Sequence, residues 1–220
     1  MTVTLFYSPI CPPARSVLLV AKALGLKLQL QEVDLLSNNY RRCKFKQEHP
    51  EKTIPTLRDG NHLIWDSHAI SEYLINQYGR KSDLRPQNII QKAHVDRWLH
   101  FDTEYLVPLT CDVLIPILFH RKYVIANSLK SSVKKIYGYL NTELSESTWL
   151  TGASPTIADL CCITSLSTLD LIVPVKQKTK LFSYIKQFRN LPYYQIGNQD
   201  GLNQVAEVLM DKIILNKYIL

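Results

Sequence analysis

The chain has 220 residues and a formal net charge of +7, with 46% hydrophobic and 20% charged residues. This composition is ordinary for a soluble globular protein of one large or two small domains. With no long uncharged apolar run, no signal-peptide pattern, and basic residues spread along the whole chain, we expect a cytoplasmic protein that binds neither membrane nor nucleic acid.

The first part of the chain alternates between strand and helix patterns. Residues 3–7 alternate apolar and polar side chains, as a strand does. Two prolines then open an apolar helix over residues 12–24, which Gly25 ends. A second strand over residues 27–35 completes a strand–helix–strand unit, so we expect a partly parallel sheet.

A hairpin and a further helix follow in the pattern. Residues 53–67 predict a β-hairpin that turns at Asp59-Gly60-Asn61. The next helix is expected over residues 68–79, and Ser67 with Glu72 downstream predicts a capping box at its start.

The remainder of the chain lacks strand signals. A polar, turn-rich segment over residues 80–88 predicts a linker. The expected helices after it span residues 89–119, with breaks or kinks at Pro108 and Pro116, and then 128–145, 156–172, 180–188 and 199–215. In "TIADL", Thr156 and Asp159 predict a capping box. The sequence thus predicts an α/β domain over residues 1–79 and an all-helical domain over residues 89–220.

Two short motifs of the first domain suggest a binding site. In "TIPTL", Pro55 either forms a cis bond that leaves nearby backbone groups free for an extended peptide ligand, or merely starts an edge strand. In "DSHAI", Asp66 and Ser67 either cap the helix or bind an α-amino acid head group. A helix N-terminus suits the carboxylate of such a group, and an acid beside it suits the ammonium.

Five motifs occur together in one order: "SPICPPARSVLLVAKALGLKL", "TIPTL", "DSHAISEYL", "LRPQN" and "TIADL". This set resembles the cytosolic glutathione transferases, and it is most similar to their insect delta and epsilon classes. The resemblance implies a thioredoxin-like N-terminal domain that binds glutathione and a helical domain with an apolar pocket for the electrophile. It also implies a homodimer, with glutathione as co-substrate and no metal.

The resemblance also implies roles for individual residues. Ile54 would pair its backbone with the cysteinyl part of glutathione, Asp66 and Ser67 would hold the γ-glutamyl head, and Lys52 would bind the glycyl carboxylate. The full expected glutathione site comprises Tyr40, Lys52, Thr53, Ile54, Pro55, Asp66 and Ser67.

Cys11 is the main departure from the resemblance. The delta and epsilon classes use a serine hydroxyl at this place to stabilise the glutathione thiolate, and a thiol is a weaker donor. Three interpretations stay open. In the first, Cys11 is itself a nucleophile. In the second, Tyr7 or Ser8 donates the hydrogen bond to the glutathione sulfur, and in the third, backbone N–H groups at residues 11–14 stabilise the thiolate.

The pocket for the electrophile should be apolar and lie on the long helix after the linker. Its expected lining is Pro13, Tyr105, Pro108, Cys111, Leu114, Ile115, Leu118 and Phe119. Cys111 falls near a place where similar proteins carry an arginine. Asp102 either approaches the glutathione of a dimer partner or, as we expect, lies on a solvated helix face. The adjacent Cys161 and Cys162 are expected in the core. An odd cysteine count without a CxxC pair speaks against disulfides and a metal site.

These observations favour a detoxifying glutathione transferase that conjugates glutathione to small hydrophobic electrophiles. One alternative is a glutathione-dependent thiol transferase or dehydroascorbate-type reductase that uses Cys11. Another is a non-catalytic binder of glutathione and an apolar ligand.

Overall fold

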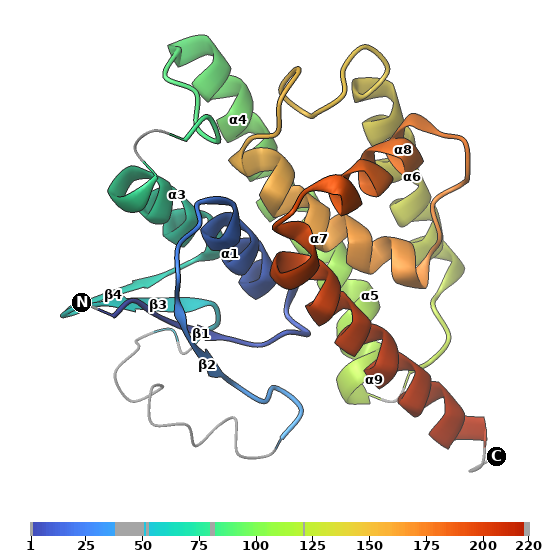
Figure 1. Cartoon of the computed structure of the whole chain (residues 1–220). Coiled ribbons are helices and arrows are strands. Elements are labelled where there is room, and N and C mark those ends of the chain that lie inside the picture. Colours follow the sequence, from blue (N-terminus) through green and yellow to red (C-terminus); the bar gives the residue numbers. More distant parts are fainter. Residues whose placement is uncertain (1, 38–50, 52, 80–81, 121, 218–220) are drawn as a thin grey trace.

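The computed structural model describes residues 2–37, 51, 53–79, 82–120 and 122–217, and side chains only to residue 212. A four-stranded sheet with the order β2-β1-β3-β4 forms one side of the molecule (Figure 1). Its strands are β1 (Thr4–Tyr7), β2 (Gln29–Glu32), β3 (Thr56–Asp59) and β4 (His62–Trp65). β1 pairs in parallel with β2, and the other two pairings are antiparallel. The predicted partly parallel sheet is therefore confirmed.

Two helices of the first part, α1 (Pro12–Ala23) and α3 (Ser67–Tyr78), pack together on one face of this sheet (Figure 1). The two prolines occupy the first turn of α1, where no backbone N–H is needed. The chain leaves α1 at Gly25, whose φ of 68° is open to glycine at little cost.

Helix α1 contributes to two hydrophobic cores. Val17, Leu18 and Ala21 pack with β1, β3 and α3. Leu19 and Val20 lie in the larger core of the helical part of the chain. The apolar side chains run nearly all round this helix because it is covered on both sides.

The rest of the described chain is helical, as predicted. The helices are α4 (Ile89–Phe101), η2 (Asp102–Leu106), α5 (Val107–His120), α6 (Asn127–Glu143), α7 (Ile157–Ile172), α8 (Lys180–Gln187), η3 (Phe188–Asn190), η4 (Gln195–Gln199) and α9 (Asp200–Lys217). Helix α7 lies at the centre, between α1 and the outer helices (Figure 1). Its Cys161 and Cys162 are fully buried, as expected.

Of the break or kink expected at Pro108, the break does not occur. Residues Ile89–His120 form one continuous helix, in which η2 is a π-helical turn just before the proline. The wider turn accommodates a residue that has no N–H to donate, so the helix continues. By length and composition alone this helix is apolar enough to cross a membrane, and here its apolar side chains pack against α7.

The linker is more deeply packed than its polar sequence suggested. Leu84 is buried and its carbonyl accepts from the N–H of Ile157 at 2.8 Å. Arg85 is also buried, and its guanidinium pairs with Glu72 of α3 (3.0 Å) and Asp96 of α4 (2.6 Å). The segment thus connects α3, α4 and α7 directly.

One predicted capping box is wrong and the other is confirmed. At α3 the N-cap is Asp66, whose Oδ1 accepts from the N–H groups of His68 and Ala69. Glu72 pairs with the linker instead. At α7, Thr156 and Asp159 form the predicted box, and both partners are buried.

Candidate functional site

Cys11 lies at the joint between the first strand and α1. It is the N-cap of α1, its N–H donates to the Ser8 carbonyl at 3.1 Å, and its side chain is partly exposed. Burial raises the pKa of the Cys11 thiol to about 11, while the Ala14 N–H and the Arg15 charge act in the opposite direction. The isolated thiol is therefore protonated near neutral pH and is a poor nucleophile.

A pocket of about 310 Å³ opens beside Cys11. One wall comes from the start of α1 and the other from α5, and α7 contributes Ser165. Its described lining is Ile10, Cys11, Pro12, Pro13, Leu35, Ile54, Val107, Thr110, Cys111, Leu114, Ile115, Leu118, Phe119 and Ser165. A mostly apolar wall around the two free thiols of Cys11 and Cys111 suits a small hydrophobic molecule held close to a sulfur atom.

Two of the eight residues expected in this pocket lie elsewhere. Tyr105 and Pro108 line a different hollow of about 580 Å³ between α5 and α6, together with Phe101 and Tyr139. The residues of the long helix that were expected in one pocket therefore lie on two faces of that helix. Tyr105 and Pro108 instead face α6, as does Asp112 one turn after Pro108. The other six, Pro13, Cys111, Leu114, Ile115, Leu118 and Phe119, surround the Cys11 pocket.

The structure places neither Tyr7 nor Ser8 on the described wall of this pocket. Tyr7 ends β1 and packs against the core between the sheet, α1 and α3. Burial, and to a lesser extent Glu32, raises the pKa of Tyr7, so it keeps its proton. Ser8 is only 3% exposed. Their positions do not favour either as the donor to a glutathione sulfur.

The backbone alternative is also weakened by the fold. Pro12 and Pro13 have no N–H, and the N–H groups of Ala14 and Arg15 both donate to the Cys11 carbonyl, at 3.1 and 3.0 Å. The backbone N–H groups of this segment therefore already have backbone partners, and of them the Ala14 N–H also acts on the Cys11 thiol.

The Ile54–Pro55 peptide bond is cis, as the sequence suggested. The bend is held by Thr56, whose hydroxyl donates to the Thr53 carbonyl at 2.7 Å. The Ile54 side chain lines the Cys11 pocket, and among the described residues its backbone N–H and C=O have no backbone partner. An extended peptide laid along this edge could therefore pair with Ile54.

Asp66 combines a capping role with an unusual backbone. Its φ of 70° lies in a region that non-glycine residues rarely adopt. The exposed carboxylate uses Oδ1 for the helix cap, while Ser67 behind it is buried. A rarely adopted backbone conformation at an exposed helix start makes Asp66 a candidate binding residue.

Sequence reasoning missed a buried polar group next to this helix start. His68 Nε2 lies 2.9 Å from Asp102 Oδ2, and its Nδ1 lies 3.0 Å from the Thr103 hydroxyl. Burial opposes a charge on His68, but Cys161 and Asp102 raise its pKa above the ordinary value. Asp102 is 2% exposed, so its expected place on a solvated face is wrong. The π-helical turn that begins at Asp102, which the sequence pattern does not reveal, accompanies this position.

Two expected glutathione ligands, Tyr40 and Lys52, lie outside the described residues. Their assignment stays a prediction. The described part of the expected glutathione site comprises the segment from Thr53 to Pro55 and the pair at the start of α3.

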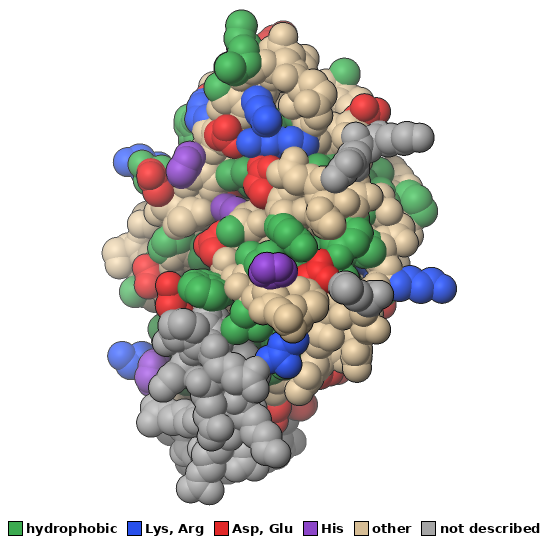
Figure 2. All heavy atoms as spheres, turned by 90° about the vertical axis from the view of Figure 1, so that its left-hand side faces the viewer, with side chains coloured by type: hydrophobic (Ala, Val, Ile, Leu, Met, Phe, Trp, Pro, Cys, Tyr) green, Lys and Arg blue, Asp and Glu red, His purple; other side chains and the backbone are tan. Residues whose placement is uncertain are grey.

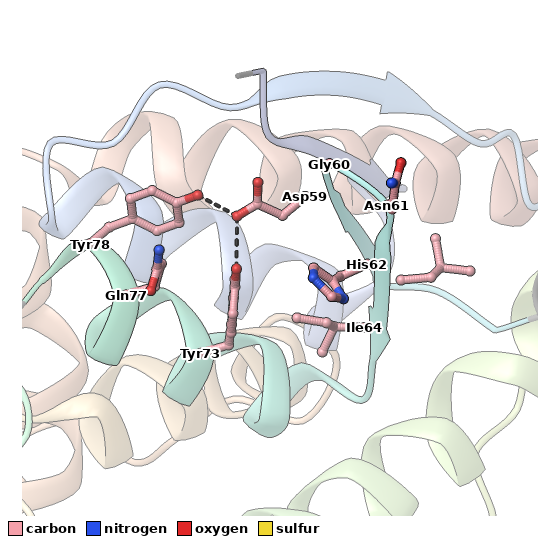
Figure 3. Close-up of a pocket in the computed structure, with 9 residues that line it drawn as sticks. Asp59, Gly60, Asn61, His62, Ile64, Tyr73, Gln77 and Tyr78 are labelled. Carbon is pink, nitrogen blue, oxygen red and sulfur yellow. Dashed lines mark hydrogen bonds between the residues drawn. The ribbon is translucent and has the colours of Figure 1, made fainter.

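A separate hollow of about 960 Å³ is lined by the β3–β4 hairpin and by Tyr73, Gln77 and Tyr78 of α3 (Figure 3). Its carboxylate, Asp59, accepts from the hydroxyls of Tyr73 (2.8 Å) and Tyr78, both of α3. These bonds tie the hairpin to the helix, and Cys11 is not among the lining residues. We interpret this hollow as structural.

Comparison with known proteins decides the family. A model of the glutathione S-transferase N-terminal domain matches residues 5–82. Glutathione S-transferase 1 of Manduca sexta is 34% identical over 217 residues, which cover 97% of this chain and all of the relative. The chain belongs to the glutathione transferase family.

Solved structures agree with this membership. An epsilon-class glutathione S-transferase from the housefly Musca domestica superposes with a TM-score of 0.90 at 30% identity, covering 96% of this chain and 98% of that one. A glutathione transferase homologue from Drosophila mojavensis with bound glutathione has a TM-score of 0.87 at 29% identity, covering 96% and 97%. The predicted thioredoxin-like domain followed by helices, and the predicted transferase activity with glutathione, are thereby confirmed.

Proposed function

We propose that this transferase conjugates the thiolate of glutathione to small hydrophobic electrophiles, as in detoxification of xenobiotics in the cytoplasm. The observation that carries the proposal is the pocket beside Cys11. It brings Ile54, next to the cis proline, within one cavity of the apolar wall of α5. If glutathione pairs with Ile54 and the electrophile binds against the wall of α5, the thiol and the electrophile meet beside Cys11.

A steady-state assay with glutathione and a chlorodinitrobenzene-type electrophile tests the proposal. We expect saturable turnover in both substrates. Glutathione binding measured by calorimetry without turnover on a broad set of electrophiles would support a non-catalytic binder instead. Failure to bind glutathione at all would contradict both.

Asp66 is proposed to hold the α-ammonium of glutathione and Ser67 its carboxylate, with the chain around Thr53, Ile54 and Pro55 pairing with the peptide. Asp66→Asn keeps an acceptor for the helix cap and suits a positive φ, but removes the charge. We therefore expect the KM for glutathione to rise about tenfold, which corresponds to ~1.4 kcal/mol of binding, with an unchanged melting temperature.

Asp66→Ala is the matched comparison for that variant. It removes the cap as well as the charge, so we expect the same rise in KM together with a loss of about 1 kcal/mol in unfolding free energy. An unchanged KM in both variants would exclude Asp66 from the glutathione site.

Conjugation is favoured over thiol transfer through Cys11. The raised pKa of this thiol leaves little thiolate to attack a disulfide near neutral pH. Mass spectrometry of the protein after incubation with glutathione disulfide checks this directly, since a Cys11 adduct is the obligatory intermediate of thiol transfer.

A homodimer is also proposed. Figure 2 shows the side of the molecule on which α3 and the β3–β4 hairpin lie, with hydrophobic side chains interspersed among charged ones. Exposed aromatic side chains also occur on α3 (Tyr78) and on the long helix (Tyr105), as expected of a surface that meets a second copy. Light scattering should then give twice the chain mass of 25.4 kDa.

A further inference from the structure

Arg15 is a buried cation without a carboxylate partner among the described residues. It lies one turn after Cys11 on α1 and is 1% exposed. Placing a charge away from water is unfavourable unless the charge is paired and its donors are hydrogen-bonded. The hydrogen-bond partners and ionisable neighbours of Arg15 therefore indicate how its charge is stabilised and on which groups it acts.

Four neutral oxygen atoms hold the guanidinium. Nε donates to Asn198 Oδ1 of η4 at 2.8 Å, and Nη1 donates to the Pro9 carbonyl at 2.9 Å. Nη2 donates to the Thr164 carbonyl at 3.2 Å and to the Thr168 hydroxyl, both on α7. These bonds tie the loop before α1 to the helical part of the chain, and they leave the positive charge unneutralised.

The start of α9 closes this site from solvent. A Cβ built on Gly201 would lie 2.5 Å from Arg15 Cδ and 2.8 Å from the Pro9 carbonyl oxygen. The backbone of α9 can approach this closely only because residue 201 is a glycine. With water kept away, the charge of Arg15 acts on its neighbours with little screening.

Among the described residues, the ionisable groups that act on Arg15 are the Cys11 thiol and the Tyr194 phenol, and the one carboxylate that acts on the nearby Cys111 is Asp112. Burial raises the pKa of Cys11 on α1, of Cys111 on α5 and of Tyr194 before η4. Arg189, which also acts on Tyr194, is a further positive charge. The charge of Arg15 therefore favours a thiolate at the start of α1, as its lowering effect on the Cys11 pKa indicates.

We propose that Arg15 is a positioning residue for conjugation, which fixes the loop that carries Cys11 and uses its unneutralised charge to stabilise the thiolate of glutathione bound against Cys11. The inference rests on the proposed conjugation. It gives the chain a second source of thiolate stabilisation, where the thiol of Cys11 is a weak hydrogen-bond donor.

Asn198→Asp tests the charge separately from the contacts. The change replaces an amide by a carboxylate of the same shape, which still accepts from Arg15 and can accept from the hydroxyls of Ser167 and Tyr194, to which the Asn198 amide now donates. We expect the pKa of enzyme-bound glutathione, followed by the ultraviolet absorbance of its thiolate, to rise by about one unit, so that kcat/KM falls about tenfold at pH values below that pKa.

Asn203→Asp is the matched control, because it adds the same charge at an exposed position one turn into α9. It should leave the bound-thiol pKa unchanged. A folded Asn198→Asp variant that binds glutathione with the native thiol pKa would overturn the proposal.

Arg15→Lys keeps the test decisive if Asn198→Asp does not fold. A lysine retains the charge but not the four bonds, so we expect a lower melting temperature and a thiol pKa within a few tenths of the native value. A rise of a full unit in this variant would show that a positive charge without the four bonds does not stabilise the thiolate, and would contradict the charge role. If the native enzyme with bound glutathione shows no thiolate absorbance, the proposed conjugation itself is refuted. This result is distinguishable from a failure of the Arg15 proposal alone, in which the native enzyme shows the thiolate and the variants do not change its pKa.

Discussion

Asp159→Ala is expected to lower the free energy of unfolding by about 3–5 kcal/mol, because it leaves several buried donors without an acceptor. Oδ1 accepts from the Leu150 N–H (2.8 Å) and the Tyr184 hydroxyl (3.2 Å). Oδ2 accepts from the N–H (2.8 Å) and hydroxyl (3.1 Å) of Thr156. For a chain of this length the melting temperature should fall by roughly 10 °C, which calorimetry can measure.

Thr156→Ser is the matched control for this prediction. It keeps the hydroxyl and the N–H that reach Asp159, so we expect a change below about 1 kcal/mol. A similarly small effect of Asp159→Ala would show that the capping box contributes little and that α7 is held by packing alone.

Asp159 should also make the free energy of unfolding depend on pH. Burial raises the pKa of Asp159 to about 6, against the hydrogen bonds from Leu150 and Thr156 that lower it. The folded chain therefore holds this proton more tightly than the unfolded chain does. The contribution of Asp159 to stability is greatest below pH ~4 and decreases as the pH rises through about 6. Asp159→Asn should lack this component of the pH profile.

Cys11→Ser is expected to raise kcat/KM for conjugation about tenfold near neutral pH. A hydroxyl is a stronger hydrogen-bond donor than a thiol, and a gain of ~1.4 kcal/mol for the thiolate corresponds to one pKa unit. The inflection of the kcat/KM profile should move to lower pH by about that amount. The measurement is a pH series with a chlorodinitrobenzene-type electrophile.

Cys11→Ala is the comparison that isolates the thiol. If it matches the native enzyme, the thiol contributes no hydrogen bond to the substrate sulfur. A large loss of activity in Cys11→Ser, combined with a glutathione adduct on native Cys11, would instead establish Cys11 as the nucleophile and reverse the preference for conjugation.

The fold was largely predictable because local patterns and tertiary packing agree. The strand, helix and turn signals of residues 3–35 and 53–79 match the elements that form, and the two prolines fall where α1 can accept them. The errors arose where a tertiary contact overrode a local signal. Glu72 has the spacing of a capping residue but pairs with Arg85, and Pro108 has the character of a helix breaker but is preceded by a π-helical turn.

The candidate site was less predictable. Cys11 stood out because a thiol precedes two prolines at a strand-to-helix joint. The roles of Arg15 and His68 depend on partners 183 and 34 residues away, Asn198 and Asp102, and no local spacing indicates such pairs. Residues of α5 line two different hollows, and which residues line which hollow likewise depends on where α6 packs.

The double burial of α1 limits how this protein can exchange parts with its relatives. Opposite faces of the helix belong to different cores, and Gly197 of η4 approaches the backbone of Leu19 so closely that a Cβ would lie 2.8 Å from its Cα. Consider a recombinant that joins this N-terminal half to the helical half of another family member at the linker. In it, α1 would pack against α7 and η4 surfaces that do not fit its side chains. Successful recombination would have to transfer α1 together with the surfaces of α7 and η4 that receive it.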